Sequence, residues 1–195
     1  ITVVCNFFET VKDLILGKIS EADGLILACP VYSLNVATPM KNFFDRLGYL
    51  AHRPQFFEKF AMSVVTCSGY GAEDALTYMD KMLTGFGFNL APSLELQVHP
   101  GKVPDKIIAL NREKSIQAVE ALISKIEQGE KDKPSVNLMV VFNLFKYVSK
   151  LDKELMPADY EYFKDKGDYY YDAKIPFYKK FIAKRVSDKI ISQFD

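Results

Sequence analysis

The chain has 195 residues, 49% of them hydrophobic, and a formal net charge of +0 at pH 7. This length can bury a substantial core in one domain, or in one domain with an appendage. The balanced charge argues against a general nucleic-acid binder, which carries a strong basic excess. No signal peptide is visible and no apolar run reaches the roughly 20 residues that span a bilayer. We therefore expect a cytoplasmic protein without nucleic-acid or membrane partners.

The cysteines and histidines form no framework or metal-ligand pattern. Cys5, Cys29 and Cys67 are an odd number without disulfide spacing, which favours reduced thiols. His52 and His99 have no partners at metal-ligand spacing, so no metal site is predicted.

The first elements in chain order are a short strand and a helix. Ile1–Val4 is a β-branched run that favours a strand, and apolar spacing predicts a helix over Glu9–Ala22.

The next stretch, Asp23–Arg46, has the order strand, loop, helix. Leu25–Cys29 is an unbroken apolar run, typical of a strand buried on both faces. Pro30 has no N–H for a ladder and should end this strand, and a short polar loop, Tyr32–Val36, follows. Thr38 should then cap a helix that has Pro39 at its first position. The apolar face of that helix comprises Met40, Phe43, Phe44 and Leu47.

A second strand and helix repeat this order. Phe60–Thr66 reads as a buried strand, and the glycine-containing loop Cys67–Gly71 follows it. Glu73 and Asp74 have the acidic bias of a helix N-terminus. We expect the buried stripe of this helix to be Leu76, Met79, Met82, Leu83 and Phe86.

The pattern continues with a strand at a sheet edge and a long helix. Leu94–Val98 alternates apolar and polar residues, and the helix runs from Pro104 to about Gln128. The charged segment Gly129–Pro134 is the best candidate for a domain boundary. We expect the inward-facing side chains of the long helix to be Ile107, Ile108, Leu110, Ile116, Val119, Leu122, Ile123 and Ile126.

Beyond the linker the composition becomes more aromatic. Val136–Leu155 predicts an apolar helix that packs on the core or a partner subunit, a reading we favour over a membrane surface. A tyrosine-rich segment follows, and the last helix, Ile175–Ser192, has a basic face that we take to be solvated.

Three segments carry a resemblance to a known family. Ala22–Leu27, Pro30–Tyr32 and Met40–Arg46 resemble the central part of the flavodoxin-like NAD(P)H-dependent FMN reductases, which include iron–sulfur flavoproteins and quinone reductases. The match is close over Glu21–Gly71. It implies a doubly wound parallel α/β sheet with helices on both faces. The family often has a motif similar to His52–Pro54, with a structural or dimer-contact role.

The resemblance implies a phosphate-binding loop after the first strand, which this sequence does not show. A parallel crossover needs about a dozen residues, so two strands and two helices do not fit before Asp23. Either the front of the domain is missing, or Val4 and Cys5 are not neighbours in the natural chain; we favour the second. In that case Cys5 could be the last member of a lost cysteine cluster, although an iron–sulfur cluster cannot be argued from the remaining residues.

The two strand-end loops are the predicted cofactor site. In an open α/β sheet, ligands bind at the carboxyl ends of the strands. Exposed aromatic and apolar side chains would form walls for a flavin ring, and glycines would allow its close approach. The predicted FMN-binding residues are Pro30, Val31, Tyr32, Ser33, Leu34, Asn35, Thr66, Cys67, Ser68, Gly69, Tyr70 and Gly71.

The resemblance implies an FMN-dependent oxidoreductase that takes electrons from NAD(P)H and passes them to a quinone, flavin or similar small-molecule acceptor. The flavin performs the chemistry, so no catalytic acid–base pair is predicted. Two alternatives remain open: an electron carrier that does not oxidise a nicotinamide, and a flavin-free interaction protein on the same fold. We expect a flavodoxin-like domain over residues 1–129, a C-terminal helical extension over 134–195, and a homodimer or homotetramer.

Overall fold

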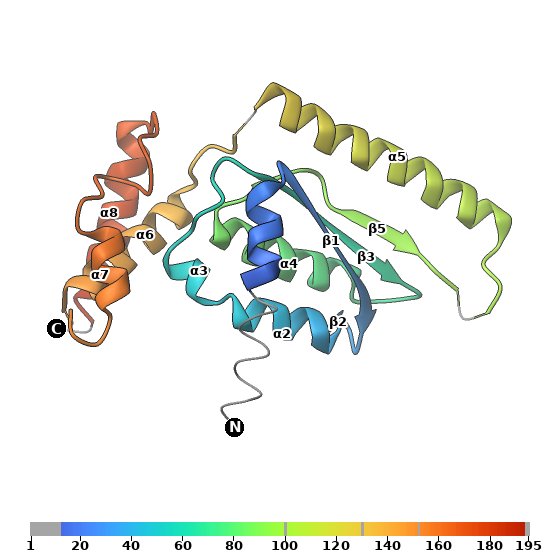
Figure 1. Cartoon of the computed structure of the whole chain (residues 1–195), viewed down its shortest axis with the longest axis horizontal. Coiled ribbons are helices and arrows are strands. Elements are labelled where there is room, and N and C mark those ends of the chain that lie inside the picture. The colour runs from blue at the N-terminus through green and yellow to red at the C-terminus, as the bar shows by residue number, and fades with distance from the viewer. Residues whose placement is uncertain (1–12, 100, 130, 152, 194–195) are drawn as a thin grey trace. The chain divides into compact units, whose positions relative to one another are not determined.

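The computed structural model describes residues 13–99, 101–129, 131–151 and 153–193 (Figure 1). They divide into two compact units. The first comprises the chain up to Ala51 and Gln55–Lys131, and the second comprises His52–Pro54 and the chain from Asp132 onward. Ile1–Val4, Cys5 and the start of the first helix lie outside the described residues, and residues 13–21 are helical as predicted.

The first unit contains further strands and helices after the helix at residues 13–21. They are β1 (Gly24–Tyr32), β2 (Asn35–Val36), α2 (Thr38–Arg46), α3 (Tyr49–His52, of which His52 belongs to the second unit), β3 (Phe60–Cys67), α4 (Ala72–Phe86), β4 (Asn89–Leu90), β5 (Leu94–Gln97) and α5 (Asp105–Gln128).

The sheet of the first unit is mostly parallel and is centred on β3. Strand β1 runs parallel to β3 with Gly24 opposite Phe60 and Pro30 opposite Thr66. On its other side β3 pairs in parallel with β4 and then with β5. Among the strands that the structure describes, only β2 is antiparallel, and it pairs with the end of β1.

Both faces of β3 are buried, as its continuous apolar sequence predicts. Ala61, Val65 and Cys67 join a core with α2 and α4, whereas Met62 and Val64 join a core with α5. Helices therefore cover both faces of the sheet, with α2 and α4 on one side and α5 on the other (Figure 1). This is the predicted flavodoxin-like arrangement.

The prediction that Pro30 ends the first strand is wrong, because β1 continues to Tyr32. Proline is tolerated where its nitrogen faces no ladder partner. In the part of the chain that the structure describes, β1 pairs on the side away from β3 only through Val31 and Tyr32. A residue with no N–H therefore need not break a ladder there.

The prediction for the start of α2 is also partly wrong. Ala37 is the N-cap residue, Thr38 is already inside the helix, and no side chain caps it. Pro39 does lie in the first turn, where its missing N–H costs nothing. The predicted apolar face is confirmed, since Phe44 and Leu47 are buried in the core of the unit.

Helix α5 has the predicted extent but a much narrower buried stripe. Only Ala118 and Leu122 are buried, with Ile126 packed partly against them. These residues are spaced four apart, so they form the single stripe that touches the sheet. The predicted inward positions Ile108, Leu110, Ile116, Val119 and Ile123 are instead exposed.

The second unit consists of α6 (Val136–Leu151), α7 (Pro157–Phe163) and α8 (Phe177–Ile191). Helix α6 is shorter than the predicted Val136–Leu155, and α7 was not predicted. Phe142 lies at the centre, with its ring centroid 4.9 Å from that of Tyr170 and 5.7 Å from that of Phe163. No helix in the described ranges has the length and apolarity needed to cross a membrane.

Candidate functional site

The candidate site lies where β1 and β3 end side by side. The parallel register places Pro30 opposite Thr66, so the segments that follow both strands emerge at the same edge of the sheet. Figure 1 shows the β1–β2 hairpin and the turn after β3 at this edge. The structure thus brings the two predicted loops together.

The first loop, predicted as a short polar loop over Tyr32–Val36, is a tight hairpin. Tyr32 and Asn35 are paired across it, and Ser33 and Leu34 form the turn with φ angles of 49° and 66°. Positive φ at both turn residues suits the right-handed twist of a two-residue hairpin. The side chains of Tyr32 and Leu34 are 64% and 61% exposed.

The second loop, Thr66–Gly71, is organised around the Cys67 thiol. The Cys67 Sγ accepts a hydrogen bond from the Gly69 N–H at 3.4 Å and donates one to the Tyr70 carbonyl at 3.3 Å. Within the described residues, the N–H groups of Ser68 and Tyr70 have no protein acceptor. Tyr70 is 88% exposed, so the loop offers an aromatic ring and backbone donors to a ligand.

The two loops touch at Gly71. This residue is the N-cap of α4 and has a φ of 95°. A Cβ at this position would lie 2.5 Å from the Leu34 Cα and 2.6 Å from the Leu34 carbonyl oxygen. Only glycine allows the hairpin turn and the start of α4 to approach this closely.

Gly69 does not have the positive-φ backbone role that the sequence indicated. It is not among the glycines with positive φ, and a Cβ there would meet no atom within 4 Å. The backbone requirement belongs to Gly71, whereas Gly69 borders open space. Whether a ligand occupies that space stays a prediction.

A pocket that the sequence did not indicate adjoins the second loop. It has a volume of about 200 Å³, and Cys67, Ser68 and Gly69 line one side of it. Gln97, Val98 and His99, at and just after the end of β5, line another part. Because β5 is parallel to β3, its end reaches the same edge of the sheet. The predicted strand Leu94–Val98 was the signal that could have identified these residues.

His52 makes structural contacts inside the second unit. Its Nδ1 lies 2.9 Å from the Asp159 Oδ2, and Arg53 donates to the Asp159 Oδ1 at 2.6 Å. The side chain of Asp159 is only 8% exposed. The Tyr162 hydroxyl donates to the Pro54 carbonyl oxygen at 2.6 Å. These contacts anchor His52–Pro54 to α7, as expected for a structural motif.

The described residues contain no converging group of three or more His, Cys, Asp or Glu side chains that could hold a metal ion. Cys29 and Cys67 are free thiols, and Cys5 lies outside the described residues.

The comparisons with known proteins place the chain in a family. Residues 9–102 match the sequence profile of the NADPH-dependent FMN reductases. The chain is 33% identical over 151 residues to an iron–sulfur flavoprotein of Archaeoglobus fulgidus, covering 76% of this chain and 67% of that protein. The sheet and its strand-end loops thus place the protein in the class of flavodoxin-like flavoproteins. The chain belongs to the NADPH-dependent FMN reductase family.

Two solved structures are similar over parts of the chain. The Trp repressor binding protein of Bacillus subtilis is 18% identical with a TM-score of 0.42, covering 62% of this chain and 71% of that one. Rubredoxin oxygen:oxidoreductase of Desulfovibrio gigas is 13% identical with a TM-score of 0.40. That match covers 55% of this chain and only 24% of the larger protein.

Family membership makes this protein an FMN-dependent oxidoreductase. The residues at the sheet edge fit a flavin ring, because unpaired backbone donors, exposed tyrosine rings and open space beside Gly69 occur together. The expected phosphate-binding loop would precede Asp23, largely outside the described residues.

Proposed function

We propose that this protein oxidises NAD(P)H with the help of FMN and passes the electrons to a quinone, a flavin or a similar small acceptor. The contact between Gly71 and Leu34 carries this proposal, because it holds the two strand-end loops against each other. The exposed tyrosine rings of both loops and the backbone donors of the second loop therefore lie at one edge of the sheet.

The loops would bind and orient the cofactor. Tyr32, Leu34 and Tyr70 would contact the flat faces and edge of the ring, since their side chains project from the loops into solvent. The N–H groups of Ser68 and Tyr70 would donate hydrogen bonds to the polar end of the ring. The redox chemistry is supplied by FMN when it is bound.

An FMN titration followed by flavin fluorescence tests the location of the site. A valine at Gly69 would occupy the open space and should weaken FMN binding more than about tenfold, or roughly 1.4 kcal/mol. Tyr32→Ala should weaken binding less, since an aromatic contact contributes about 0.5–1.5 kcal/mol. Tyr178→Ala, which removes a similarly exposed tyrosine from α8, is the matched control and should bind like wild type. Wild-type affinity in both loop variants would place the site elsewhere.

Kinetics with a quinone then test the reaction. The flavin-loaded protein should consume NADH or NADPH only while an acceptor is present, and the Gly69→Val variant should lose this activity in proportion to its lost flavin. A protein that binds FMN but does not oxidise either nicotinamide would be an electron carrier. A wild-type protein that never binds FMN would contradict the proposal altogether.

A further inference from the structure

The second unit contains a cavity that the flavin chemistry does not use. It has a volume of about 550 Å³ and lies between α6, α8 and the segment that contains Gly167 and Asp168. Helices α6 and α8 pack against each other, and the Asn143 amide donates to the Ser187 hydroxyl at 3.1 Å. The volume falls in the range of about 300–1,000 Å³ that is usual for small-molecule sites.

Four lysines from the two helices line this cavity. Lys146 and Lys150 are four residues apart on α6, and Lys180 and Lys184 are four residues apart on α8. This spacing places both members of each pair on one helix face. Two pairs of lysines therefore line the same cavity, one pair from each helix.

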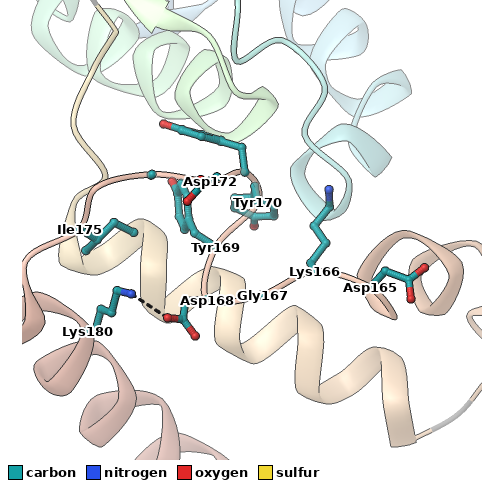
Figure 2. A pocket seen from close by; sticks show the side chains of 11 residues that line it. Asp165, Lys166, Gly167, Asp168, Tyr169, Tyr170, Asp172, Ile175 and Lys180 are labelled. Atoms are coloured by element: carbon teal, nitrogen blue, oxygen red, sulfur yellow. Dashed lines mark hydrogen bonds and ion pairs between the residues drawn. The ribbon is translucent and has the colours of Figure 1, made fainter.

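Two of these lysines have protein partners and two do not. Figure 2 shows the ion pair between Lys180 and Asp168, whose Nζ and Oδ2 atoms are 2.7 Å apart. Lys146 donates to the carbonyl oxygens of Lys166 and Gly167. Among the described residues, neither the Lys150 nor the Lys184 ammonium group has a hydrogen-bond or ion-pair partner.

The cavity is therefore positively charged. Asp168 and Asp188 are the acidic residues that line it, which leaves a formal charge of +2 with the four lysines. Like charges at this helical spacing repel each other. The pKa of Lys146 is lowered by burial and also by the charge of Lys150. A ligand with two or more negative charges would relieve this repulsion.

We propose that this cavity binds a small molecule that carries a diphosphate group. Lys150 and Lys184 would contact the phosphate oxygens, while Lys146 and Lys180 would hold the cavity wall in place and add to its positive charge. Tyr147 and Ile191 form an apolar part of the lining, which could accept the nucleoside of a nucleotide. The diphosphate is the shared chemistry of a nucleotide and of free pyrophosphate.

Isothermal titration calorimetry of the full chain with pyrophosphate, ADP and adenosine tests the proposal. Pyrophosphate and ADP should bind, and their affinity should fall as salt increases because the lysines are partly exposed. Tighter binding of ADP would assign the site to a nucleotide, and equal binding would assign it to the diphosphate alone. Binding of adenosine as tight as that of ADP would contradict the proposal.

Paired charge variants separate a local site from general attraction. Lys150→Gln with Lys184→Gln should weaken pyrophosphate binding at least about tenfold, since two direct charge contacts are lost. Lys174→Gln with Lys189→Gln removes the same charge from exposed positions that do not line the cavity, and should change affinity less than about twofold. Equal losses in both double variants, or no binding by the wild type, would overturn the proposal. The flavin content should be the same in all variants.

Discussion

At the scale of single residues, Gly71 sets the shape of the candidate site. Its positive φ begins α4, and its missing side chain lets the Leu34 backbone approach the loop after β3. The same residue therefore serves the helix start and the contact between the loops. A substitution there should disturb both.

We expect Gly71→Ala to lower the free energy of unfolding by about 1–3 kcal/mol, because an L-residue is strained at this φ. The new methyl group should also push the hairpin away and weaken FMN binding. Urea unfolding and an FMN titration measure the two effects. Gly69→Ala is the matched control, with a change within about 0.5 kcal/mol expected, since its added Cβ meets no atom. Equal stability of the two variants would show that the contact is unimportant.

Asp159 has a comparable role in the second unit, where its nearly buried carboxylate binds both His52 and Arg53. Asp159→Ala should lower the free energy of unfolding by about 1.5–3 kcal/mol, because hydrogen bonds to a charged carboxylate are lost. Denaturant unfolding measures this change. Asp165→Ala, at an exposed position in the same unit, should have almost no effect. A similar, small effect of both substitutions would mean that the Asp159 contacts contribute little.

At the scale of elements, β1 and α5 show how tertiary contacts change the structure that a sequence pattern predicts. Strand β1 continues through Pro30 because one side of the strand is largely unpaired among the described residues. Helix α5 is long and rich in isoleucine, but it touches the sheet along one stripe only. Its remaining apolar side chains, such as Ile116 and Ile123, are exposed.

At the scale of the whole molecule, exposed apolar side chains support the proposal of a homodimer or homotetramer. Helix α8 exposes Phe177, Tyr178, Phe181, Ile182 and Val186, and Phe177 is 81% exposed. Contiguous apolar surface of this kind commonly marks an interface.

Phe177→Ser with Phe181→Ser should shift the protein to a smaller species in sedimentation velocity, because the buried apolar area of an interface would be lost. Leu14→Ser changes an exposed apolar residue outside α8 and should leave the assembly intact. A wild-type protein that sediments as a monomer at all concentrations would refute the proposed assembly.

The sequence alone determined the parallel α/β class, because the continuous apolar runs Leu25–Cys29 and Phe60–Thr66 predict parallel strands. Burial on both faces is confirmed for Phe60–Thr66 but is wrong for Leu25–Cys29, since Ile26 and Ala28 are exposed. It also located the two strand-end loops, since strand direction and order place both at one edge. Only the tertiary structure decided that Gly71, and not Gly69, holds the loops together. That distinction depends on how closely the Leu34 backbone, in the turn between β1 and β2, approaches the loop after β3. The stripe Ala118–Leu122 of α5 and the partners of Asp159 likewise depend on contacts between residues distant in sequence, which local periodicity does not encode.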